Sequence, residues 1–424
     1  MLCAFASCEI DEQFDPNGPS IASVLNNATP AELSLLATGI EASMRNGYAG
    51  YVTATGSIAR ELYIFDADPR NTEDLLGKED LVLDANTFYI TGPFGTAYRT
   101  VKNVNVLLEA LENTDLVTEA EKEGYRGFAK TIKAHMLSRV LDMLGDNGIR
   151  VDVSDPENLG PFLDEDASYS AILNLLDEAH DHLQGANFIF TLSDGFENFA
   201  TPATFAEFNR AIAARVATHA ARYQEALNYV NESFLALDTN LLDVGPEHVF
   251  STNPGDLLNP LFKTPGQSGD QIIVHPRIIN DTTAGDERIS KFRLRMQEGG
   301  QDGLNGRYEI ALYESSTSPI DIIRNEELVL IYAEANINLG NLQEGVRAIN
   351  IVRNAAGIGD YEGPVTQEAL IDEMLYQRTY SLWAEGHQMF DLRRYDRLNA
   401  DFLPIDREGD DVFVQFPIPL SEGI

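Results

Sequence analysis

The chain has 424 residues, of which 44% are apolar, and its 67 acidic and 30 basic residues give a formal net charge of −37. So acidic a surface repels phosphate backbones and argues against nucleic-acid binding, and no stretch approaches the ~20 apolar residues of a membrane-spanning helix. Cys3 and Cys8, both at the N-terminus, are the two cysteines, which excludes a disulfide-built fold and a cysteine-based metal site.

The N-terminal segment resembles a lipoprotein processing signal. Phe5, Ala6 and Ser7 precede Cys8, and an apolar residue followed by small residues before a cysteine is the pattern of a bacterial lipobox. We expect Cys8 to be acylated and the polar residues that follow, up to about residue 20, to form a tether. The segment before Cys8 is too short for a full signal peptide, so we expect it to be a remnant of one, or the true start of the protein to lie upstream. The alternative is that Cys8 is an incidental cysteine near the terminus.

Helical periodicity dominates from about residue 30 to residue 237. Apolar residues recur at spacings of three and four, as on one face of a helix. The six stripes are Leu33–Met44, Val101–Leu111, Phe128–Leu144, Tyr169–Leu183, Phe205–Val216 and Tyr223–Leu237. Short polar turns between them predict helices stacked as hairpins.

The pattern changes between about residues 240 and 318. Proline and glycine become frequent, and Phe292–Arg295 and Tyr308–Tyr313 alternate like short strands. Long irregular segments in compact domains usually carry a binding surface. We therefore predict an irregular lobe with short strands on the ligand side of the molecule.

Helices return between Pro319 and about residue 400. One apolar stripe, Leu328–Leu339, stops at Gly340, a typical residue for the end of a helix. A second helix is predicted from about residue 342 to 354, and a third begins after Thr366, a good N-cap. Small residues where the first two cross resemble a tetratricopeptide hairpin, which must stack on others to bury its apolar face.

Several motifs in this region resemble the SusD/RagB family. In chain order they are Pro319–Arg324, Glu327–Ala335, Asn350–Arg353, Glu385–Arg394 and Phe416–Pro419. The helix around Tyr98 and the segment Asn209–Val216 resemble the N-terminal half of the same family. Gln377 and Gln388 depart from it, since Glu and Arg are usual there. The resemblance covers nearly the whole chain after the tether.

This resemblance implies a mainly α fold in which degenerate tetratricopeptide-like hairpins form a right-handed scaffold, beside a loop-rich lobe with short strands. One domain would span residues 21–424, after a processing and tether segment at 1–20. The implied protein is a non-enzymatic, lipid-anchored protein of the outer-membrane surface without a cofactor. It would capture oligosaccharides or other oligomeric nutrients, including peptides, and deliver them to a SusC-like TonB-dependent transporter.

Two other classes of function stay open: a helical-repeat scaffold that binds only proteins, and a polysaccharide-degrading enzyme. The sequence has no phosphate-binding loop, serine nucleophile elbow or zinc-protease motif. A pair of glycosidase carboxylates needs a spacing of ~5–10 Å that a sequence does not show. No catalytic residue is therefore proposed.

Sugar binding requires flat aromatic faces beside polar side chains. The only tryptophan, Trp383, falls within a helical motif, so we expect it to pack in the core. The ligand candidates are Phe88, Tyr89 and Phe94, in a predicted loop before the Tyr98 helix, and Asn305, Arg307, Tyr308 and Tyr313 in the irregular lobe. For each one, a role in local packing is the alternative.

The C-terminal motif also carries charges that we expect to be structural. Arg378 lies on an apolar helix face, and a buried charge needs a partner; Glu385 or Glu327 is predicted to supply it. His387 and Asp391 are too few ligands for a closed metal site, so a hydrogen-bonded histidine is expected and no metal is proposed. Arg324 and Arg393 complete the motif.

Overall fold

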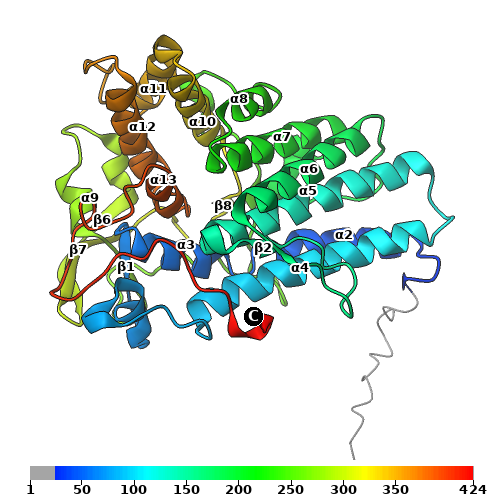
Figure 1. Cartoon of the computed structure of the whole chain (residues 1–424), viewed down its shortest axis with the longest axis horizontal. Coiled ribbons are helices and arrows are strands. Elements are labelled where there is room, and N and C mark those ends of the chain that lie inside the picture. Colours follow the sequence, from blue (N-terminus) through cyan, green and yellow to red (C-terminus); the bar gives the residue numbers. More distant parts are fainter. Residues whose placement is uncertain (1–23, 424) are drawn as a thin grey trace, which may run out of the picture.

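The computed structural model describes residues 24–423. Long helices lie side by side through most of the molecule, and a strand-rich lobe stands at one end (Figure 1). The predicted mainly α fold with short strands is confirmed. Cys3 and Cys8 fall outside the described residues, so lipidation of Cys8 stays a prediction. Within the described range, no helix combines the length and apolarity needed to cross a membrane.

Within the described residues, seven helices build the N-terminal half. They are α2 (Pro30–Ser43), α3 (Tyr48–Ile58), α4 (Phe88–Glu112), α5 (Glu119–Leu144), α6 (Glu165–Leu183), α7 (Pro202–His219) and α8 (Tyr223–Asn231). From α4 to α8 each helix packs on the next in the chain. Reciprocal hydrogen bonds at the N-terminal ends of α2, α5 and α7 satisfy backbone N–H groups there.

The boundaries of two predicted helices were wrong. Helix α4 begins at Phe88, so Phe88, Tyr89 and Phe94 lie on its first turns and not in a loop. Burial of Tyr89 and Phe94 stabilises these turns against the unfavourable Pro93 inside the helix. Helix α8 ends at Asn231, short of the predicted Leu237.

Four helices form the C-terminal half: α10 (Asn325–Asn338), α11 (Leu342–Ala355), α12 (Gln367–Ser381) and α13 (Gln388–Arg394). Helices α10, α11 and α12 share a compact apolar core, and α10 also packs on α7 and α8, which joins the two halves. A Cβ on Gly345 would lie 2.5 Å from Cγ1 of Ile337. The predicted close crossing of α10 and α11 therefore depends on glycine.

The lobe contains a four-stranded antiparallel sheet in the order β1-β5-β7-β6. Its strands are β1 (Leu62–Phe65), β5 (Gln271–Val274), β6 (Phe292–Gln301) and β7 (Leu304–Ile310). The predicted strand Phe292–Arg295 lies within β6, whereas the predicted strand Tyr308–Tyr313 overlaps β7 only from Tyr308 to Ile310. Strand β1 comes from the N-terminal half, so the lobe is not made only of residues 240–318.

Smaller elements complete the fold. Strands β2 (Ile149–Arg150) and β3 (Phe162–Leu163) form one short pair, and β4 (Glu247–His248) and β8 (Ile320–Asp321) form another. Helix α9 spans Pro276–Asn280. After α13 the chain returns over the N-terminal half, where the backbone N–H of Phe416 donates to Met143 and that of Leu420 donates to Ala85 (Figure 1).

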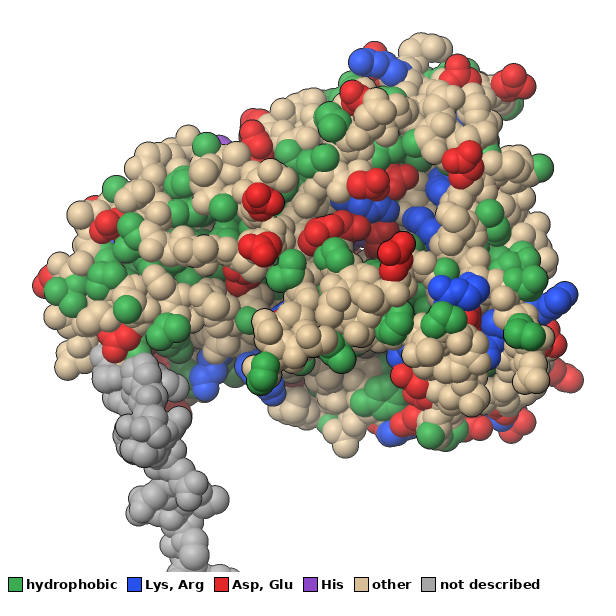
Figure 2. All heavy atoms as spheres, turned by 180° about the vertical axis from the view of Figure 1, so that it is seen from behind, with side chains coloured by type: hydrophobic (Ala, Val, Ile, Leu, Met, Phe, Trp, Pro, Cys, Tyr) green, Lys and Arg blue, Asp and Glu red, His purple; other side chains and the backbone are tan. Residues whose placement is uncertain are grey.

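Trp383 packs in the core, as predicted. Its side chain is fully buried, its indole N–H donates to the carbonyl of Glu61 at 3.2 Å, and its ring meets Phe292 edge-on. Seen from the opposite side, acidic and basic side chains gather in a depression near the middle of the molecule (Figure 2). Acidic and basic side chains therefore lie close together on this face.

Candidate functional site

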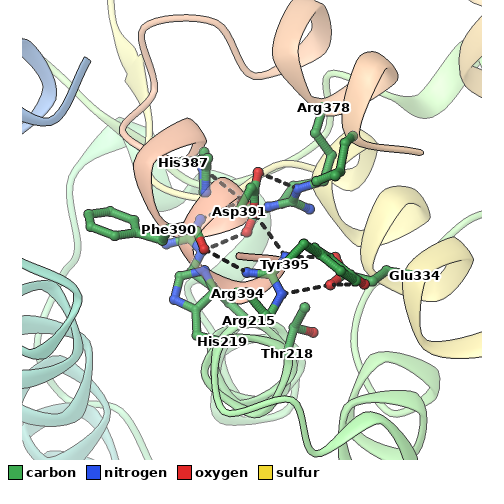
Figure 3. A network of polar contacts seen from close by, with 12 residues as sticks. Arg215, Thr218, His219, Glu334, Arg378, His387, Phe390, Asp391, Arg394 and Tyr395 are labelled. Carbon is green, nitrogen blue, oxygen red and sulfur yellow. Dashed lines mark hydrogen bonds and ion pairs between the residues drawn. The ribbon is translucent and has the colours of Figure 1, made fainter. Parts of the chain in front are cut away.

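A buried network of charged groups joins α10, α12 and α13 (Figure 3). Arg394 donates to both carboxylate oxygens of Glu334, at 2.7 and 2.9 Å, and to Asp391 at 2.9 Å. Arg378 donates to the other oxygen of Asp391 at 2.6 Å. The hydroxyl of Tyr395 donates to Glu334 at 3.0 Å. Two carboxylates and two guanidiniums therefore neutralise one another where all four side chains are buried.

The predicted partners of Arg378 were wrong, because it binds Asp391. Helix α12 ends at Ser381, and the chain then turns through left-handed conformations at Ala384 and Gly386. That turn takes Glu385 off the face of Arg378 and carries it to Arg324, 2.7 Å away.

Glu327 pairs instead with Arg215 on α7, which reaches both of its oxygens at 2.6 and 2.5 Å. Burial alone would raise the pKa of Glu327, but the charge of Arg215 and the neighbouring His387 hold it at about 2. Arg215 also donates to the carbonyl of Ile322 at 2.8 Å. This pair therefore fastens α7 to the start of α10.

His387 lies inside this network with its Nε2 3.7 Å from Glu327. Burial lowers its pKa to about 3, so the ring is neutral at ordinary pH. Among residues 24–423, no three His, Cys, Asp or Glu side chains converge in a way that could hold a metal ion. His387 and Asp391 thus belong to one polar network with Arg378.

The three candidates on α4 have different surroundings. Phe88 is 42% exposed, whereas Tyr89 and Phe94 are 1% and 6% exposed. The Tyr89 hydroxyl donates to the Asp74 carboxylate at 3.1 Å and accepts from the backbone N–H of Asp84 at 2.5 Å. Tyr89 therefore anchors the segment before α4, and only Phe88 presents a ring to solvent.

We expect Tyr89→Phe to lower the free energy of unfolding by about 1–2 kcal/mol, because it removes a hydroxyl with two hydrogen bonds. Ligand affinity should stay unchanged. Urea unfolding and ligand titration measure the two quantities. Tyr361→Phe is the control, since Tyr361 is half-buried between α11 and α12 and its hydroxyl makes a single hydrogen bond, to the carbonyl of Pro364 at 3.1 Å. A Tyr89→Phe protein with normal stability but weaker ligand binding would contradict this role.

Phe88 has two partners that the sequence pattern did not indicate. The guanidinium carbon of Arg70 lies 5.0 Å from the centre of the Phe88 ring. Asp68 accepts from Arg70 at 2.8 and 2.6 Å and so fixes its plane. We call Phe88, Arg70 and Asp68 the Phe88 platform. The stretch Asp-Pro-Arg at 68–70 is a turn signal, but its meeting with Phe88 arises only in the fold.

The remaining candidates lie on or after β7. Asn305 and Arg307 are exposed, and Tyr308 is half-buried opposite the exposed Leu294 of β6. Tyr313 is also half-buried, and burial around its hydroxyl raises its pKa well above the usual value.

The tip of the β6–β7 hairpin is fastened to the segment that precedes α4. Asp302 binds Lys78 at 2.5 Å and also pairs with Arg407. The structure therefore places the β7 candidates in the same lobe as the segment carrying Arg70.

The chain is similar to known proteins in sequence and in fold. The model of the SusD family matches residues 283–417, which include Glu334, Arg378, Asp391 and Arg394 of the network in Figure 3. A SusD superfamily protein from Bacteroides vulgatus is 18% identical, covers 93% of this chain and 96% of its own, and superimposes with a TM-score of 0.68.

Residues 283–417 match the SusD family, and the whole chain has the fold of SusD superfamily proteins.

Other solved structures agree in fold. Surface glycan-binding protein A from Bacteroides thetaiotaomicron is 16% identical, with 93% of this chain and 96% of that chain covered and a TM-score of 0.70. Its complex with laminarihexaose gives 15% identity, 93% and 97% coverage and the same TM-score. No curated protein sequence matches.

In this chain, most residues of the SusD-family motif make contacts that stabilise the fold. Arg324, Glu327, Arg378, Glu385 and Asp391 all form buried or nearly buried ion pairs. Of the two departures, Gln377 is buried and donates to Glu373 at 2.7 Å, and Gln388 is buried beside the network. Arg393 differs from the other motif residues, since it is half-exposed and donates to the carbonyl of Val414 at 3.2 Å.

Proposed function

We propose that this chain is a non-enzymatic, lipid-anchored surface protein that captures glycans and delivers them to a SusC-like TonB-dependent transporter. The observation that carries glycan capture is the Phe88 platform. Relatives of the same fold support it, since one was solved with laminarihexaose and another is described as a laminarin-binding SusD-like protein.

The platform has the groups that a sugar ring requires. A pyranose stacks the apolar face formed by its C–H bonds on an aromatic ring, and Phe88 leaves 42% of its surface to solvent. Arg70 supplies N–H donors in a fixed plane, and Asp68 supplies acceptors for hydroxyls. Asn305, Arg307 and Tyr308 in the same lobe are proposed as further contacts for an oligomer. Capture then requires no covalent step.

Phe88→Ala should weaken binding of laminarihexaose, or of whichever glycan binds best in a panel, by at least about thirty-fold, or ~2 kcal/mol, as for a central aromatic contact. Stability should change by less than ~0.5 kcal/mol because the ring is exposed. Isothermal titration calorimetry and thermal melting measure the two effects.

The chain contains a matched control. Phe402 is 57% exposed, has the guanidinium of Arg397 5.3 Å from its ring centre, and Arg397 pairs with Asp372. Phe402→Ala should leave glycan affinity unchanged. If only Phe402→Ala weakens binding, the site is assigned to the wrong part of the molecule.

The wider proposal has its own tests. Binding of proteins but of no glycan or peptide would favour a helical-repeat scaffold, and turnover of a polysaccharide that one carboxylate substitution abolishes would favour an enzyme. Radiolabelled palmitate should enter the wild-type protein but not a Cys8→Ser variant. Crosslinking in native membranes should recover a TonB-dependent transporter.

A further inference from the structure

A hollow of about 580 Å³ lies where the ends of α5, α6 and α7 meet α13 and the returning C-terminal segment. Volumes of roughly 300–1,000 Å³ are usual for small-molecule sites. No residue of the Phe88 platform lines it. Its acidic and basic lining consists of Asp146, Glu165, Asp166, Asp396, Arg393 and Arg394. The hollow is therefore separate from the platform and has more acidic than basic groups.

Two of these charged groups already have partners within the protein. The carboxylate of Asp166 accepts from Arg222 at 2.6 Å. Arg394 is bound by Glu334 and Asp391. Neither Asp166 nor Arg394 therefore leaves an uncompensated charge in the hollow.

The other four charged groups are not paired. The carboxylates of Asp146, Glu165 and Asp396 have no basic nitrogen within 4.0 Å in the described part of the chain. Arg393 has no carboxylate within the same distance there, and it donates to the carbonyl of Val414 at 3.2 Å. Among residues 24–423, three unpaired carboxylates thus face one unpaired guanidinium, so the hollow favours a cation over a neutral molecule or an anion.

Glu165 and Asp146 lie within hydrogen-bonding reach of each other. Burial raises the pKa of Glu165, Arg393 opposes this shift, and the charge of Asp146 adds to it. Two adjacent carboxylates repel each other when both are ionised, and a cation between them removes that repulsion. Within the described range, no three His, Cys, Asp or Glu side chains converge in a way that could hold a metal ion. The pair therefore suits an organic cation, which needs fewer acceptors than a metal.

Tyr169 contributes an unused hydroxyl to the same hollow. Its side chain is 4% exposed and lines the hollow, and no hydrogen bond within residues 24–423 involves its hydroxyl. The hydroxyl oxygen is not among the buried atoms sealed from solvent. Burial raises the pKa of the phenol, and the charge of Asp142 adds to this shift. The neutral hydroxyl therefore offers an acceptor to an entering N–H group, in a place where a hydrogen bond is strong.

We propose that this hollow binds the protonated primary amine of a small ligand, such as an amino sugar or a diamine. An ammonium group brings one positive charge and three N–H donors, which match the carboxylates of Glu165 and Asp146 and the hydroxyl of Tyr169. A hydroxyl in its place brings one donor and no charge. The site acts independently of the Phe88 platform.

The test compares amines with neutral molecules of the same shape, by saturation-transfer NMR and calorimetric titration at pH 7. D-glucosamine is paired with D-glucose and N-acetyl-D-glucosamine, and cadaverine is paired with 1,5-pentanediol. At least one amine should bind about ten-fold more tightly than its neutral counterparts, and added salt should weaken this binding. Binding of glucosamine alone would identify an amino-sugar site, and binding of cadaverine alone would identify a diamine site.

Two variants test the assigned contacts. Glu165→Gln should weaken binding of the amine about ten-fold, and Tyr169→Phe should weaken it about 3- to 10-fold. Neither change should lower the melting temperature appreciably, because Glu165 has no basic partner within 4.0 Å and the Tyr169 hydroxyl has no hydrogen-bond partner in the described part of the chain. Glu362→Gln is the matched control, since Glu362 is exposed between α11 and α12; it should bind the amine normally.

Absence of binding by both amines, equal binding of the neutral counterparts, or unchanged affinity in Glu165→Gln would each overturn the proposal. Phe88→Ala should leave amine binding intact, and Tyr169→Phe should leave glycan binding at the platform intact. Failure of one site is thereby distinguished from failure of the other.

Discussion

Replacing Arg394 by methionine should lower the free energy of unfolding by about 3–5 kcal/mol. Arg394 holds both oxygens of Glu334, whose side chain is fully buried. Removing one partner of a buried pair leaves an uncompensated charge, and this penalty is much larger than the net contribution of the pair itself. Asp391 still pairs with Arg378 in this variant, so Glu334 is the carboxylate that loses its charge partner. Urea unfolding at neutral pH measures the loss.

Two variants separate this explanation from a general intolerance of substitution. The double variant Arg394→Met with Glu334→Leu should recover much of the lost stability, because neither charge is then left unpaired. Arg397→Met breaks a pair in which Asp372 is 57% exposed and should cost less than ~1 kcal/mol. Equal losses in Arg394→Met and Arg397→Met would show that the buried network does not have the assigned importance.

Glu61→Gln should stabilise the protein at pH 8 and hardly change it below pH 4.5. Glu61 is 1% exposed, and burial raises its pKa to about 8 against an unfolded value near 4.5, although Arg277 opposes the shift. The folded state then retains a proton that the unfolded state releases. This contribution to stability is fully present below pH 4.5 and declines by about 1.4 kcal/mol per pH unit until pH 8.

Glutamine keeps the shape of the side chain and an acceptor for the Ala384 N–H, 3.4 Å away, but it does not titrate. The gain over the wild type should therefore grow between pH 4.5 and pH 8, reaching about 4–5 kcal/mol. Urea unfolding of both proteins at pH 5, 6.5 and 8 tests this, since all other titrating groups are shared. Parallel pH curves for the two proteins would contradict it.

Helices with a regular spacing of apolar residues could be predicted from the sequence. So could the C-terminal motif, because its residues lie close together along the chain. The stripes of α2 and α6 each lie on one apolar face, so spacing revealed them. Helices α5 and α7 are buried around most of their surface, but large apolar residues still recur in them at helical spacing. Helix α3 was missed because it is buried on most sides and shows no stripe. Strand β1 was missed because four consecutive apolar residues do not by themselves indicate a strand. They form one here because they pair with β5.

The candidate site was less predictable for the same reason. The orientation of α4 about its own axis decides that Phe88 is exposed and that its neighbour Tyr89 is buried. The contact of Arg70 with Phe88, and the choice of Asp391 by Arg378, depend on turns whose paths are set by packing. Residue types indicated which side chains required partners, whereas tertiary structure decided which partners they found.

The C-terminal segment that returns over the N-terminal half affects the order in which the chain folds. Strand β1 finds its partner only when residues 271–274 have been made, and Met143 and Ala85 receive hydrogen bonds from Phe416 and Leu420 near the end of the chain. Contacts so distant in sequence form slowly, since loop closure precedes any gain from pairing. The first half must therefore remain incomplete until synthesis of the chain is nearly finished.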